Sequence, residues 1–172
     1  MAGVKTLADA RTKVALITVL GEVDLDALTV AQLTAAQDIS CDLAKAGTRF
    51  SPTASDSFSD AAFCDEGNPQ SFGPSNYEAS AVVFWYLDPD TGQYVEADNT
   101  AYEALKTKGA RTIVALREGP HYKQEWAAGD VYDAYEVTSD NPQRGTETSG
   151  YIKRIIPLAV QKAALDKTVV GA

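Results

Sequence analysis

The amino-acid sequence predicts a mainly β protein: an antiparallel β-sandwich or barrel with one flanking α-helix and a long loop. First, about six or seven runs rich in β-branched and aromatic residues follow one another between turn-forming residues. Second, only residues 98–108 carry apolar side chains at helical spacing, so the alternating strands and helices of a parallel sheet are absent. Third, 172 residues with 45% hydrophobic content suit one domain, residues 1–172, that buries its own core.

Apolar runs bounded by turn formers mark the expected strands. The strongest is 81–87, an aliphatic and aromatic run that we expect to be buried on both faces, with Trp85 in the core. Pro157 lacks an amide hydrogen and would place its strand at a sheet edge or a bulge. The other expected strands are 14–20, 39–44, 111–118, 131–138, 151–158 and, as a final strand or extended C-terminal segment, 159–172.

The one predicted helix covers residues 98–108. Asp98 or Asn99 can cap its N-terminus, and Gly109 ends it. The preceding Asp-Pro-Asp-Thr-Gly of residues 88–92 predicts a tight turn, because its spacing does not fit a calcium loop. Residues 21–37 are acidic and then rich in threonine and alanine, and we expect one helical turn or a loop there.

The segment of residues 46–76 is too long for an ordinary connection and is rich in Ser, Pro, Gly, Asp and Asn. Disordered segments are poor in aromatic residues, yet most of the phenylalanines lie here. Either the loop folds back on its own core or a partner subunit covers these rings. We expect an inter-subunit contact, because large exposed apolar patches mark interfaces. The rings are Phe50, Phe58, Phe63 and Phe72.

The charge is acidic and unevenly distributed. With 15 basic and 24 acidic residues the net charge is −9, which disfavours binding to nucleic acid or to anionic membranes. No basic residue lies between Arg49 and Lys106, whereas residues 144–172 are mildly basic. This asymmetry either serves solubility or lets the acidic face of one copy meet the basic end of the next, head to tail. In the second case, Lys153 and Arg154 are candidate contact residues.

No motif predicts catalysis, a cofactor or a metal. The sequence has no glycine-rich phosphate loop and no nucleophile elbow. His121 is the only histidine, and with Cys41 and Cys64 it falls short of the four ligands of a structural zinc site. The two cysteines are either free thiols or one disulfide. We therefore expect no catalytic residue, no cofactor-binding residue and no metal ligand.

Short motifs follow one another in order along nearly the whole chain: residues 1–14, Asp-Ile-Ser-Cys at 38–41, Phe-Ser-Pro-Thr at 50–53, Phe-Gly-Pro-Ser-Asn-Tyr-Glu at 72–78, Arg-Glu-Gly-Pro at 117–120, Glu-Trp-Ala-Ala-Gly-Asp at 125–130, Asp-Asn-Pro-Gln at 140–143 and Gly-Tyr-Ile-Lys-Arg at 150–154. Each motif is weakly specific by itself. Together they resemble the major tail tube proteins of long-tailed, siphovirus-type phages that infect actinobacteria.

This resemblance implies a β-sandwich-like fold with a flanking helix, six copies in a ring, and rings stacked into a hollow tube that conducts DNA to the host. It implies that the long loop, here 46–76, reaches a neighbouring ring. The protein would be a structural, non-enzymatic part of the virion tail, assembled in the host cytoplasm and without membrane contact. Its partners would be further copies and the tape measure, terminator and tail tip proteins, while genomic DNA passes without specific binding.

Two other functions fit the same sequence. One is a different phage structural component, a tail terminator or a capsid decoration protein. The other is a monomeric bacterial β-sandwich binding domain, which would stay monodisperse and show a concave ligand site. Tube formation separates the first interpretation from both alternatives.

Overall fold

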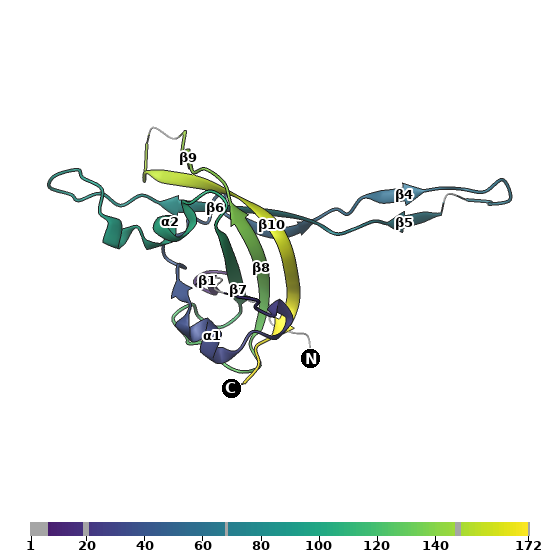
Figure 1. The fold of residues 1–172 in the computed structure, drawn as a ribbon, viewed down its shortest axis with the longest axis horizontal. Coiled ribbons are helices and arrows are strands. Elements are labelled where there is room, and N and C mark those ends of the chain that lie inside the picture. The colour runs from purple at the N-terminus through teal and green to yellow at the C-terminus, as the bar shows by residue number, and fades with distance from the viewer. Residues whose placement is uncertain (1–6, 19–20, 68, 147–148, 172) are drawn as a thin grey trace.

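The computed structural model describes residues 7–18, 21–67, 69–146 and 149–171 (Figure 1). Within them one eight-stranded antiparallel sheet has the order β2-β1-β7-β8-β10-β6-β3, and β9 pairs with the start of β10. Its strands are β1 (Thr12–Thr18), β2 (Gln37–Asp38), β3 (Arg49–Thr53), β6 (Asn76–Phe84), β7 (Arg111–Glu118), β8 (Val131–Ser139), β9 (Gln143–Arg144) and β10 (Lys153–Thr168). A separate two-stranded sheet joins β4 (Ser57–Ser59) to β5 (Gln70–Phe72). The predicted mainly β, antiparallel fold class is confirmed.

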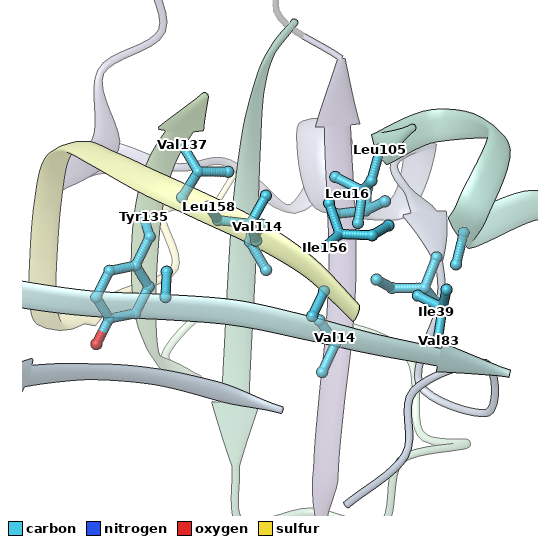
Figure 2. Packing of buried hydrophobic residues seen from close by; sticks show 13 residues of the cluster. Val14, Leu16, Ile39, Val83, Leu105, Val114, Tyr135, Val137, Ile156 and Leu158 are labelled. Atoms are coloured by element: carbon cyan, nitrogen blue, oxygen red, sulfur yellow. The ribbon is translucent and has the colours of Figure 1, made fainter. Parts of the chain in front are cut away.

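The sheet curls so that its two ends enclose the main core. Figure 2 shows side chains from β1, β6, β7, β8 and β10 meeting between the two halves of the curled sheet. Helix α2 (Thr100–Leu105) adds Ala101 and Leu105 at one end of this core. The labelled residues of the cluster are Val14, Leu16, Ile39, Val83, Leu105, Val114, Tyr135, Val137, Ile156 and Leu158.

A second apolar cluster covers the other face of β1, β7 and β8. It includes Leu25 and Leu28, in and beside the 3₁₀ turn η1 (Leu25–Ala27), and Leu33 from helix α1 (Val30–Ala35). The buried Tyr132 hydroxyl fixes this layer, since it donates to the Leu25 carbonyl at 2.8 Å and accepts from the Leu28 amide at 2.9 Å. The central strands are thus buried on both faces, which fits their high content of apolar residues.

The described residues contain two α-helices, whereas the sequence predicted one helix and, in residues 21–37, one helical turn or a loop. Residues 30–35 form α1, which begins with a capping box in which Thr29 and Gln32 bond each other's backbone amides. Only Leu33 of this short helix is buried, so its apolar stripe is too brief to detect in the sequence. Helix α2 exists but is shorter than predicted. Asn99 stands at its N-cap, yet its side chain instead bonds the backbone of Tyr86 and Val95.

The predicted strand at 39–44 is also wrong. The chain leaves β2 and turns, so that Ile39 and Leu43 are apolar without being extended in a ladder. The Ile39 amide donates to the Val14 carbonyl at 3.0 Å, and the Ala44 amide donates to the Val82 carbonyl at 2.8 Å. This segment therefore bridges β1 and β6 and closes the curled sheet on its open side.

The two C-terminal strands that the sequence suggests are one strand, β10. Its first part pairs with β6 and its second part with β8, and Leu158 lies at the changeover. Pro157 is neither at a sheet edge nor at the bulges, which follow Val160 and Ala164. The Pro157 carbonyl accepts the amide of Asp140, which lies just past the end of β8. The missing amide hydrogen of Pro157 points to the same side, where β8 has ended, so no bond of the β8 ladder is lost. Residues 19–20 and 172, the ends of two predicted segments, lie outside the described residues.

Strand β6 begins earlier and ends earlier than the predicted 81–87 strand. Ala81, Val82 and Val83 are buried as expected, but the strand ends at Phe84. Trp85 is half-buried beyond the strand end and belongs to neither core cluster, so its predicted core position is wrong. It packs instead against Tyr94 and Tyr102, with ring centroids 4.6 and 4.8 Å away.

We expect Trp85→Ala to lower the free energy of unfolding by about 1–2 kcal/mol, below the ~3–5 kcal/mol of a fully buried tryptophan. Solvent already reaches part of the indole, so less apolar area is lost. Ile156→Ala, at a fully buried position, is the comparison and should lose about 2–5 kcal/mol. Chemical denaturation measures both variants. If Trp85→Ala lowered the free energy of unfolding as much as Ile156→Ala does, the indole would have to be a core side chain, and this account of Trp85 would be wrong.

Candidate assembly interface

A long arm leaves the body of the protein between β3 and β6. We define it as residues 54–75, which contain β4, β5 and the tip between them (Figure 1). The sequence suggested a loop without regular structure, but both sides of the arm are extended and pair with each other. The Gly73 amide donates to the Asp56 carbonyl at 2.7 Å, and the Asn76 side chain donates to the Ala54 carbonyl at 3.2 Å. The arm is therefore an extended ribbon that does not fold back.

The phenylalanines of this region divide into two groups. Phe50 precedes the arm in β3, is partly buried, and lies 5.9 Å from the Tyr135 ring between centroids. Phe58 and Phe72 are 63% and 82% exposed, and Phe63 at the tip is fully exposed. Phe58, Phe63 and Phe72 are thus exposed on a ribbon that has no hydrophobic core to bury them.

The Phe58 side chain on β4 reaches across the arm and lies over Gly73, just after β5. A Cβ atom at position 73 would stand 2.7 Å from the Phe58 ring, closer than side chains tolerate. A side chain at position 73 would therefore force the Phe58 ring to move aside. Phe58 thus contacts the opposite strand of the arm while most of its ring stays open to solvent.

The arm is uniformly acidic. It carries four carboxylates and no basic residue, and apart from the half-buried Ser55 and Gly73 its described residues are exposed. Cys64 sits beside Phe63 at the tip as a free, exposed thiol, and Cys41 on the body is also free and exposed. The structure therefore contains no disulfide between them. The carboxylates are Asp56, Asp60, Asp65 and Glu66.

A second aromatic region surrounds the end of β6 and the start of β10. The Arg154 guanidinium lies 4.1 Å over the Trp85 ring, and Phe84 meets Tyr151 edge to face at 5.7 Å. The Trp85 amide donates to the Ile152 carbonyl at 2.9 Å, which ties the two strands at this point. We call this region the aromatic–arginine surface, defined by Phe84, Trp85, Tyr94, Tyr102, Tyr151, Ile152 and Arg154.

Ion pairing fixes one side of this surface. The Tyr94 hydroxyl donates to Glu103 at 2.6 Å, and Lys106 pairs with the same carboxylate. Partial burial, together with this hydrogen bond, raises the pKa of Tyr94, and the bonds from Lys106 and Tyr94 lower the pKa of Glu103. Tyr94 therefore remains a neutral donor, and Glu103 a charged acceptor, throughout the neutral range.

The structure separates the predicted contact residues within one chain. The exposed rings of the arm lie on one side of the body, whereas Lys153 and Arg154 lie at the start of β10, next to β9 (Figure 1). Sequence reasoning named the two cations but missed that Arg154 lies over the Trp85 ring. The aromatic run at residues 84–86 is the signal in the sequence, but an apolar run of this kind predicts a core strand equally well.

A buried arginine was not predicted. Arg117 on β7 is fully buried, and its guanidinium donates to Asp130 at 2.6 Å, to the Gln124 carbonyl at 2.8 Å and to the Glu125 carbonyl at 3.0 Å. It also lies 4.9 Å over the Trp126 ring. The motifs at 117–120 and 125–130 are therefore one structural unit, in which the arginine holds the following loop on the sheet.

Other groups with possible chemistry are dispersed. Among the described residues no three His, Cys, Asp or Glu side chains gather as a metal site would require. His121 is exposed and stacks on Tyr122 at 4.9 Å. Within the same described ranges, no helix is long and apolar enough to cross a membrane.

Comparison with known proteins gives one positive result. The sequence matches the family profile described as phage tail tube protein over residues 1–172, the full length of the chain. No curated protein matches the chain in sequence. The profile match covers both the curled sheet and the projecting arm, so it bears on the entire molecule described above. The chain belongs to the phage tail tube protein family.

Proposed function

We propose that residues 1–172 form a single tail tube domain that self-assembles into stacked hexameric rings, the hollow tail tube of a siphovirus-type phage of actinobacteria. The observation that carries this proposal is the arm, which presents Phe58, Phe63 and Phe72 to solvent. Burying each ring against a neighbour would contribute about 1.5–3 kcal/mol, a sufficient reason to assemble. Its role is structural and non-enzymatic.

The tube conducts genomic DNA to the host without binding it. The net charge of −9 supports this function, because a wall that repels phosphate does not retain DNA in transit. We place carboxylates of the acidic residues between Arg49 and Lys106 near the lumen, and we place Lys153 and Arg154 away from it. The subunits assemble in the host cytoplasm, with the tape measure, terminator and tail tip proteins as further partners.

The purified protein is expected to show no measurable affinity for double-stranded DNA at physiological salt. At that ionic strength each charge acts over about 8 Å, so only groups close to the lumen wall affect passing DNA. Fluorescence anisotropy with a labelled duplex tests this, and a positively charged DNA-binding protein serves as the control. Saturable binding by assembled tubes would contradict an acidic lumen.

End-on views of the assemblies in the electron microscope test the ring itself. The proposal predicts closed rings with six-fold rotational symmetry and an open centre. Single rings that never stack would favour a tail terminator. Sheets or amorphous clusters would contradict a tube subunit altogether.

A further inference from the structure

We propose that the acidic arm of one copy docks on the aromatic–arginine surface of the next copy. This inference rests on the proposed function and identifies the surface that receives the arm. The contact is heterologous, since the arm and its receptor are different parts of the chain. Repeating such a contact builds rings or filaments rather than closed dimers.

The first support is exposure. Tyr151 is 78% exposed and Ile152 is 51% exposed, side by side at the start of β10. Tyr94 and Leu87 are each 37% exposed on the loop that follows β6. Large apolar side chains gathered in this way mark protein interfaces, and aromatic residues with arginine are enriched in interface cores.

The second support is charge complementarity. Arg144 on β9 and Lys153 and Arg154 at the start of β10 lie near the exposed Tyr151 in the chain, whereas the arm carries only carboxylates. The loop after β6 and α2 carry carboxylates of their own, so the positive charge is confined to the β9 and β10 side of the surface. Among these carboxylates, Asp88 accepts three bonds within its turn, and Glu103 binds Lys106 and Tyr94. Opposite charges guide association and select the correct partner.

The third support is placement. Figure 1 shows the arm extending to one side of the body, while α2 and the loop after β6 lie on the opposite side. An arm of this length cannot fold back onto the aromatic–arginine surface of its own chain without abandoning its ribbon. Two copies in a row, however, bring the arm of one toward that surface of the other.

A groove beside Cys41 is the competing receptor. It encloses about 680 Å³ and is lined by Leu43, Phe50, Leu116 and Tyr122. Its apolar side chains Leu43, Phe50 and Leu116 already pack against the main core of their own chain. The groove therefore offers an incoming ring less exposed apolar area than Tyr151 and Ile152 do. The aromatic–arginine surface therefore fits the arm better.

Photo-crosslinking from the arm tip distinguishes the two receptors. The thiol of Cys64 is labelled with a benzophenone maleimide in a Cys41→Ser background, mixed with excess unlabelled protein, assembled and irradiated. Mass spectrometry should place the crosslink in residues 84–94 or 143–154 of a neighbouring copy. Crosslinks to residues 8–14, 40–51 or 116–122 would overturn the inference while leaving the tube function intact.

Charge exchange provides an independent test. Lys153→Glu with Arg154→Glu should raise the critical concentration for assembly at least about tenfold, as should Asp65→Lys with Glu66→Lys. Combining all four substitutions should restore assembly toward wild type. Lys162→Glu, an exposed position on β10 outside the surface, is the matched control and should change it less than twofold.

The outcomes separate the two proposals. Circular dichroism and a melting curve first establish that every variant is folded. The docking site would be overturned if the charge-reversed pairs assembled like wild type. It would also be overturned if the combined variant had a critical concentration no lower than either pair alone. Neither result would contradict the tube function. A wild-type protein that forms no tubes at any concentration would instead overturn the proposed function, and the docking site with it.

Discussion

Replacing Phe63 and Phe72 with serine is expected to abolish tube formation and to leave a folded monomer. Neither ring packs on the body of its own chain, so their loss should not disturb the core. If both are buried in each inter-subunit contact, their removal costs about 3–6 kcal/mol. That corresponds to roughly a hundredfold to ten-thousandfold weaker contact. Sedimentation velocity and electron microscopy at matched concentrations measure the effect.

Val131→Ser is the control for this double variant. Val131 is 51% exposed at the start of β8, away from the arm, so its replacement should leave assembly unchanged. Normal tubes from the double phenylalanine variant would refute the contact between arm and neighbour. A melting temperature well below that of wild type would show instead that the rings stabilise their own chain.

Asp130→Ala is expected to destabilise the protein by about 3–5 kcal/mol, the usual result of leaving a buried charge without its partner. Arg117 is fully buried, and Asp130 supplies its counter-charge at 2.6 Å. Asp130 also accepts the Ala127 amide at 3.0 Å, so its loss frees the loop as well. For a chain of this size the melting temperature should fall by roughly 6–20 °C.

Two further variants make this prediction specific. Asp140→Ala breaks the Lys108–Asp140 pair, whose side chains are 65% and 55% exposed, and should cost less than about 1 kcal/mol. Adding Arg117→Met to Asp130→Ala should recover stability, because the unpaired charge is then gone. A double variant less stable than Asp130→Ala would show that packing of the arginine, rather than its charge, dominates.

The strands of the central sheet were predictable because they are buried on both faces. Residues 111–118 and 131–138 are rich in apolar and β-branched residues, and β7 and β8 begin at the same residues. Burial by itself does not distinguish a strand from a turn, however. Ile39 is as buried as any strand residue, but it lies in the segment that closes the curled sheet.

The sequence predicted that the rings of the arm are exposed, but not that the arm is a paired β-ribbon. Composition singled out residues 46–76 because aromatic rings occur among turn formers, and Phe58, Phe63 and Phe72 are exposed in the structure. Composition gave no boundary between β3 and the arm, so Phe50 could not be recognised as part of the body. That boundary depends on pairing with β6, a contact between distant parts of the chain.

The surroundings of two further residues, Arg117 and Trp85, did not follow from the sequence. Arg117 occurs in an alternating strand where a charged residue would ordinarily face solvent, and the carbonyls that enclose it come from the following loop. Trp85 belongs to an apolar run, yet β6 ends before it and Arg154 from β10 covers its ring. The environment of Arg117 thus depends on how the following loop folds, and that of Trp85 depends on Arg154, a partner distant in sequence.

Electron microscopy of the concentrated wild-type protein tests the central claim most directly. The protein is purified without other tail components, concentrated stepwise and imaged in negative stain at each step. We predict hollow tubes of uniform diameter whose number rises steeply above a critical concentration. A protein that stays a monodisperse monomer at every concentration, with the arm intact by mass spectrometry, would contradict self-assembly into a tail tube.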